Sequence, residues 1–157
     1  MTDRSAAPPA HQGRHLAVSL ANDVRELARV GAAVDEFCSV ASLGQRLGYA
    51  VNLAVEEVLA HIIANAYSDN DMHRIEVAVY LDSDQFEVFV VHDGRSLQMH
   101  PPPDSSSVDP PENLGALDGA SPSALDHLGL LLVHQVMDSV ASVRRNGCNA
   151  VVMTKQL

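Results

Sequence analysis

The spacing of apolar residues divides the chain into helical and extended segments. Across residues 24–40 they recur every three or four positions, which predicts a helix with one buried face. Asn22 and Asp23 come just before it and offer side-chain oxygens for an N-cap. The same spacing continues across residues 45–67, so a second and longer helix is predicted there.

Alternating apolar and polar positions predict strands, because successive side chains of a strand point to opposite faces. A short polar link, residues 82–84, predicts that two of these strands form a hairpin. Asn146-Gly147 is typical of a type I′ turn and predicts a second hairpin. The predicted strands are residues 15–20, 74–81, 85–92, 140–145 and 149–155.

Residues 96–126 interrupt the pattern, with several prolines among serines and aspartates. A stretch of this length without periodicity is typical of a functional lid or an insertion. A third helix is predicted at residues 123–138. We interpret residues 1–13 as a disordered leader and residues 14–157 as a single domain, with 96–126 as its lid segment.

The order of elements is strand, two helices, two strands, lid, helix and two strands. Adjacent strands along the chain favour an antiparallel or mixed sheet, and the helices must then cover one of its faces. The predicted class is therefore α+β, a two-layer α/β sandwich. Its mixed, mostly antiparallel sheet is covered on one face by about three helices.

Charge and composition narrow the choice of partners. The net charge of -10 argues against a nucleic-acid partner, because binding phosphates needs a basic face. No apolar run in the sequence approaches the ~20 residues of a membrane helix, and we expect no membrane contact. Cys38 and Cys148 are too few for a disulfide framework, so free thiols and a cytoplasmic location are expected.

Three groups of polar residues are candidates for chemistry. Glu57, His61 and Asn65 are spaced by four and so share one helix face, which either lines a cleft or is simply solvated. The second group, His92-Asp93-Gly94, ends a strand and is either a binding group at the rim of the sheet or an ordinary turn. The third, His127-Leu128-Gly129-Leu130, opens the last helix, where a glycine either admits a phosphate or packs against the sheet.

The order and spacing of these groups resemble the GHKL, or Bergerat-fold, ATPases, and within them the anti-sigma-factor serine kinases of bacterial partner switching. The stretches "NLAVEEVLAHIIANAY", "FVVHDGRSL" and "LDHLGLLLVHQVMDSV" are similar to the family's three nucleotide motifs. The resemblance spans residues 15–157. It implies ATP and Mg²⁺ as cofactors, a STAS-domain anti-anti-sigma protein and a sigma factor as partners, and a homodimer.

Histidines replace other residues at three motif positions. The resemblance assigns Glu57 as the general base, while the magnesium-binding asparagine is replaced by His61 and the later histidine by Asn65. Imidazole nitrogen is a poor ligand for Mg²⁺, which prefers oxygen. His92 stands where the family has the aspartate that binds adenine, and Gly94 matches the glycine of that motif. Asp93 is expected to point to the other side of the strand.

In the third motif His127 replaces the first glycine, and Gly129 and Leu130 match the family pattern. Three functions remain open. The chain is an ATP-dependent serine kinase, a degenerate module that regulates by protein binding alone, or a regulator with a transition-metal site. For the last, the candidate ligands are Glu57, His61, His92 and His127, since imidazole and carboxylate suit zinc.

Overall fold

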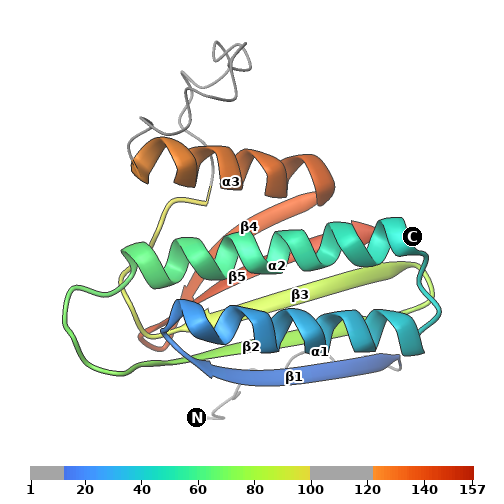
Figure 1. The fold of residues 1–157 in the computed structure, drawn as a ribbon, viewed down its shortest axis with the longest axis horizontal. Helices are drawn as coiled ribbons and strands as arrows, with labels where there is room; N and C mark the ends of the chain where they lie inside the picture. The colour runs from blue at the N-terminus through green and yellow to red at the C-terminus, as the bar shows by residue number, and fades with distance from the viewer. Residues whose placement is uncertain (1–12, 100–121) are drawn as a thin grey trace, which may run out of the picture.

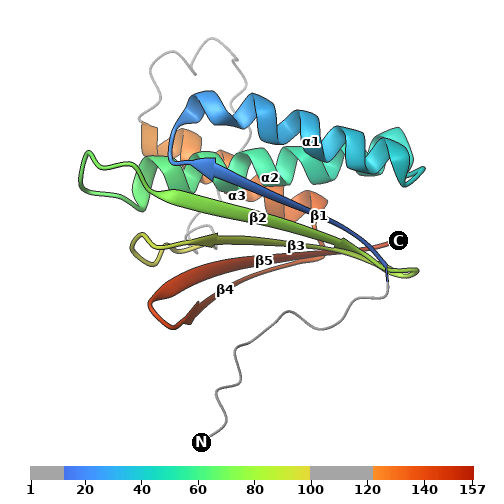
Figure 2. The ribbon, with the colours of Figure 1, turned by 90° about the horizontal axis from the view of Figure 1, so that it is seen from below.

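The protein forms two layers, a sheet and a group of helices packed on one of its faces. The computed structural model describes residues 13–99 and 122–157, without the side chains of residues 122–127. Five strands make up the sheet, and three α-helices lie side by side above it (Figure 1). Figure 2 shows the layers edge-on, with no helix of the described residues on the opposite face. The predicted two-layer α/β sandwich is confirmed.

Every pair of neighbouring strands in the described sheet is antiparallel. The order across the sheet is β1-β2-β3-β5-β4, so β2, β3 and β5 lie inside it and β1 and β4 form its edges. The pairing of β3 with β5 joins segments on either side of the predicted lid. The strands are β1 (Arg14–Ala21), β2 (Arg74–Leu81), β3 (Gln85–His92), β4 (Ser139–Arg145) and β5 (Cys148–Gln156).

Both predicted hairpin turns are present. The backbone N–H of Asp82 donates to the carbonyl of Gln85 at 3.0 Å and closes the β2–β3 link. Between β4 and β5, Asn146 and Gly147 have φ angles of 51° and 78°. A type I′ turn requires positive φ at both central residues, which asparagine and glycine adopt at least cost.

The helices are α1 (Leu27–Val40), α2 (Gln45–Asn65) and α3 (Pro122–Val136), with a 3₁₀ turn η1 (Val24–Glu26) before α1. The first predicted helix therefore begins with a 3₁₀ turn, and the predicted Asp23 cap accepts a hydrogen bond from the backbone of Arg25. The third helix begins at Pro122, so the last five residues of the predicted lid, 122–126, are helical. Proline suits a first helical position because its missing N–H would have had no partner there.

Helix α2 is the central helix and lies between the other two. By length and composition alone, with 21 residues and a mean hydropathy of 1.4 in its most apolar 18-residue window, it could cross a membrane. Its apolar residues belong to the core of the domain, however, where they meet the inward faces of the strands. The buried residues of α2 are Gly48, Val51, Ala54, Val55, Val58, Leu59 and Ile62.

The core predicts a clear difference between two substitutions. Leu59→Ala removes a side chain that is 0% exposed, so we expect the free energy of unfolding to fall by about 2–5 kcal/mol. Met72→Ala, at a residue that is 83% exposed, should change it by less than about 0.5 kcal/mol. Urea unfolding followed by circular dichroism measures both, and equal effects would contradict the described core.

Candidate functional site

Helix α2 carries Glu57, His61 and Asn65, and the structure confirms that they lie along one face. All three side chains are half-buried. Asn65 donates its side-chain N–H to the carbonyl of His61 at 2.9 Å, and the same nitrogen lies 3.2 Å from His61 Nδ1. The amide of Asn65 therefore fixes the ring of His61 in place.

His92 is the last residue of β3 and points into the protein. It is 2% exposed, and its Nδ1 makes no hydrogen bond with the described residues. Burial lowers its pKa, so the ring is neutral at neutral pH. Asp93 is exposed on the other side of the strand, as predicted. Alternation along β3 turns the side chain of His92 toward the helices, where it is excluded from solvent.

The turn that follows, Asp93-Gly94, is fastened to the end of α2. The backbone N–H of Arg95 donates to the carbonyl of Ala66 at 2.8 Å. A Cβ atom on Gly94 would stand 2.6 Å from that same carbonyl oxygen. Only glycine allows the turn to approach the helix so closely, which gives the motif's glycine a structural role in this chain.

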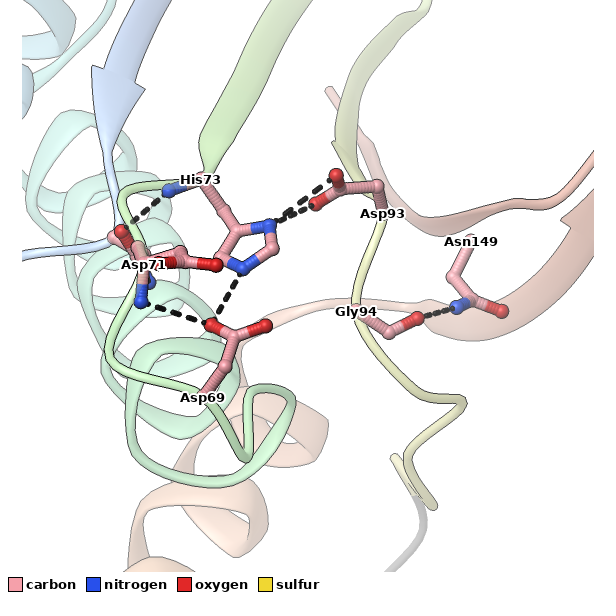
Figure 3. A network of polar contacts seen from close by, with 7 residues as sticks. Asp69, Asp71, His73, Asp93, Gly94 and Asn149 are labelled. Atoms are coloured by element: carbon pink, nitrogen blue, oxygen red, sulfur yellow. Dashed lines mark hydrogen bonds and ion pairs between the residues drawn. The ribbon is translucent and has the colours of Figure 1, made fainter.

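Asn149 of β5 holds the same turn from the sheet, and the sequence analysis did not single it out. Its side-chain N–H donates to the carbonyl of Gly94 at 2.7 Å (Figure 3). Its Oδ1 accepts from Ser96 Oγ at 2.8 Å. Asn149 is 1% exposed and pairs with His92 across the sheet. A polar residue at an inward position of an alternating strand was the signal that could have revealed it.

The third motif lies within α3 rather than at its start. The helix begins at Pro122, so Gly129 is its eighth residue. Only the first four N–H groups of a helix lack partners in the helix, and Gly129 therefore cannot offer a free amide to a phosphate. Leu130 is buried in the core. His127 is helical, and its side chain lies outside the described residues.

Gly129 instead allows α3 to pack against Glu57. A Cβ atom on Gly129 would overlap Glu57 Oε2 and stand 3.2 Å from its carboxyl carbon. The three nearest heavy atoms to that position all belong to Glu57. The candidate general base therefore lies directly against the backbone of α3, and the glycine packs on a helix rather than on the sheet.

Comparison with known proteins settles the family. The sequence model of the histidine kinase-like ATPase domain matches residues 20–155. The chain belongs to this family. This histidine kinase-like domain has the GHKL fold that the three motifs predicted. A comparison with curated protein sequences finds no significant match.

Solved structures share the fold of this histidine kinase-like domain at low identity. The RsbU and RsbW domains of Rv1364c from Mycobacterium tuberculosis match with a TM-score of 0.63 and 13% identity, over 92% of this chain and 32% of that one. A chain of the SiaB–SiaC complex from Pseudomonas aeruginosa matches with a TM-score of 0.51 and 13% identity, over 90% and 89%. The histidine kinase domain of the blue-light activated kinase EL346 from Erythrobacter litoralis matches with a TM-score of 0.50 and 18% identity, over 85% and 60%.

The residues of this domain fit ATP and Mg²⁺ poorly. At the expected adenine position the domain has the buried, neutral ring of His92 in place of a carboxylate. At the expected magnesium position it has His61, whose nitrogen is a softer ligand than Mg²⁺ prefers. Gly129, expected at the phosphates, has its amide inside α3. Each of these three positions thus departs from what the bound nucleotide would need.

A transition-metal site gains no support from the described residues. Among residues 13–99 and 122–157, no group of three or more histidine, cysteine, aspartate or glutamate side chains is arranged to hold a metal ion. Of the four predicted ligands, Glu57, His61 and His92 are described and do not form such a group. The side chain of His127 lies outside that search. Both cysteines are free, as predicted, with Cys38 buried and Cys148 exposed.

A double-mutant cycle tests the contact between Gly129 and Glu57. Gly129→Ala should raise the free energy of unfolding by about 1 kcal/mol in a Glu57→Ala background, because alanine is the better helix former. In the wild-type background the gain should be smaller or reversed, since the new methyl group must displace the Glu57 carboxylate. Chemical unfolding of the four variants measures the difference.

Gly31→Ala in α1 is the matched control for this cycle. A Cβ atom at position 31 would have Asn52 as its nearest neighbour, so its effect should not depend on Glu57. If Gly129→Ala changes stability equally in both backgrounds, Glu57 does not lie against α3 as described.

Proposed function

We propose that this chain is a partner-switching regulator that acts by holding another protein, either a STAS-domain anti-anti-sigma protein or a sigma factor. Support comes from the family match over residues 20–155 and from fold similarity to the RsbU and RsbW domains and to a chain of the SiaB–SiaC complex. The chain spans 32% of the Rv1364c structure. We place the regulator in the cytoplasm and, by resemblance to the kinase family, as a homodimer.

The packing of α3 on Glu57 carries the choice between protein binding and phosphoryl transfer. A general base must come within hydrogen-bond reach of the hydroxyl that it deprotonates. Here the Glu57 carboxylate lies against the backbone at Gly129, on the inner side of α3. This contact, together with the buried His92, favours a degenerate module that regulates by protein binding without ATP.

ATP-dependent serine kinase activity is the second candidate, because Glu57 itself is retained at the general-base position of α2. In that function Glu57 would take the proton of the partner's serine, with His61 and Asn65 nearest the metal ion. The adenine ring of ATP would lie beside His92, Asp93 and Gly94. Its phosphates would lie beside His127, Gly129 and Leu130. The poor fit of these residues to ATP and Mg²⁺ makes this function the weaker of the two.

Protein binding predicts an affinity that is independent of nucleotide. A STAS-domain protein encoded beside this chain should bind it with the same dissociation constant in EDTA and in ATP with Mg²⁺. The physical reason is that no contact of the complex would pass through a nucleotide. Isothermal titration calorimetry measures both values, with a STAS-domain protein from an unrelated system as the control. Binding that appears only with ATP and Mg²⁺ would contradict this prediction.

A nucleotide titration of the purified chain separates the two functions. Titration of ATP with Mg²⁺ should give no binding heat for the wild-type chain, whereas the double variant His61→Asn with His92→Asp should gain affinity. Asparagine restores an oxygen ligand for Mg²⁺, and aspartate restores an acceptor for the adenine amino group. Circular dichroism must show that the variant is folded, since it places a carboxylate at a buried position.

His15→Asn, at an exposed position on β1, is the control and should remain without affinity. ATP binding by the wild-type chain, with phosphate transfer to a STAS-domain serine that Glu57→Ala abolishes, would overturn the nucleotide-free function and establish the kinase.

A further inference from the structure

His73 lies between two carboxylates that come from different parts of the chain. Its Nε2 is 2.7 Å from Asp69 Oδ1, in the loop after α2. Its Nδ1 is 3.3 Å from both carboxylate oxygens of Asp93, in the turn after β3. Figure 3 shows the ring between the two side chains, just before β2 begins. One imidazole thus connects the end of α2 with the turn that carries the second motif.

Neighbouring groups hold the ring in this position. The ring of Tyr67 stacks on it, with centroids 4.5 Å apart and planes inclined by 21°. The backbone N–H of His73 donates to Asn22 Oδ1 at 2.8 Å, which ties it to the end of β1. Because stacking and the backbone hydrogen bond fix the His73 ring, the ring does not move when Asp69 or Asp93 moves. A change in the protonation of His73 therefore changes how firmly these two carboxylates are held.

The two other titratable rings near His73, those of Tyr67 and His92, are uncharged at neutral pH. Burial and the nearby carboxylates of Asp93 and Asp69 raise the pKa of Tyr67 to about 12, so its hydroxyl is uncharged. The ring centroid of His92 lies 6.4 Å from that of Tyr67, and burial lowers the pKa of His92, so this ring is also uncharged. Other charged side chains nearby include two arginine–carboxylate pairs, Arg29 with Glu26 and Arg74 with Glu76, and the carboxylates of Asp23 and Asp71.

The number of protons on His73 decides how many carboxylates it can hold. A charged imidazole has two N–H donors and can donate to Asp69 and Asp93 together, whereas a neutral ring has one donor and one lone pair. Hydrogen bonds to the two carboxylates raise the pKa of His73 above its ordinary value of 6.5. When the proton leaves, the shorter contact with Asp69 retains the donor, and a lone pair then faces the Asp93 carboxylate.

We propose that proton binding by His73 fastens the Asp93–Gly94 turn to the start of β2, and that proton loss releases the Asp93 side of this link. The contacts of Gly94 with Ala66 and Asn149 do not depend on pH, so the turn loosens without detaching. The second motif would thus be held more firmly at low pH than at high pH. This inference does not rest on the proposed function, because it concerns the turn itself in the isolated chain.

The sign of the effect follows from the raised pKa. A group whose pKa is higher in the folded state contributes its full stabilisation below the unfolded value of 6.5, and loses it as pH rises through the folded value. The backbone N–H of Arg95, two residues after Asp93, is hydrogen-bonded to the carbonyl of Ala66, so its exchange rate reports on how firmly the turn is held. Exposed ion pairs contribute little, so its hydrogen-exchange protection should fall by about two- to five-fold as His73 deprotonates.

Hydrogen exchange of the full chain, followed by NMR from pH 5.5 to 8.5 and corrected for the intrinsic rate, tests the proposal. The His73 ring resonances, recorded in the same samples, should titrate above pH 6.5 and coincide with the loss of Arg95 protection. His73→Gln should abolish the pH dependence of that protection.

Asp93→Asn is the sharper variant, because an amide can accept from the charged ring or donate to the neutral one. The turn should then remain equally protected across the pH range. His15→Gln, at an exposed histidine on β1, is the matched control and should leave the wild-type profile unchanged. Protection of Arg95 that is independent of pH in the wild-type chain, or that changes equally in Asp93→Asn, would overturn the proposal.

Discussion

The burial of α2 is the interaction on which the rest of the structure depends. The described helices cover one face of the sheet, and α2 lies in the middle of that layer, so it packs on strands below and on a helix at either side. The apolar residues of its inward face are almost completely excluded from water, and the hydrophobic effect of that burial fixes the rotation of the helix about its axis. With the buried face on the sheet, the side chain of Glu57 lies against α3 at Gly129.

The sequence predicted the elements well, because their periodicity follows from the same burial. Both hairpins were identified from local turn chemistry, and the strands β2 and β3 were predicted to the residue. The start of α3 was predicted to within one residue, whereas the predicted lid was extended to residue 126, five residues into the helix. The all-antiparallel order could not be derived, because the position of β5 beside β3 depends on long-range pairing rather than on local pattern.

The candidate site was only partly predictable for a similar physical reason. Spacing alone placed Glu57, His61 and Asn65 on one face, and alternation alone placed Asp93 outside. The contacts that define the site in space join distant segments: Gly129 with Glu57, and Asn149 with Gly94. Position in a motif suggested a phosphate-binding role for Gly129, while its position in the helix gives it a packing role. A glycine in a motif can serve either phosphate binding or close packing, and the position of Gly129 in the helix decides for packing.

The pairing of β3 with β5 has a consequence for how this domain can change its length. The chain leaves the sheet after β3 and returns to it at β4, and the residues between, 93–138, include α3 and the whole of the predicted lid. The entropy lost in closing such a loop grows only with the logarithm of its length, so doubling the loop adds about 0.6 kcal/mol. The entropic cost of pairing β3 with β5 therefore depends only weakly on how many residues lie between the two strands. A chain with a longer or a shorter connection would form the same sheet at almost the same entropic cost.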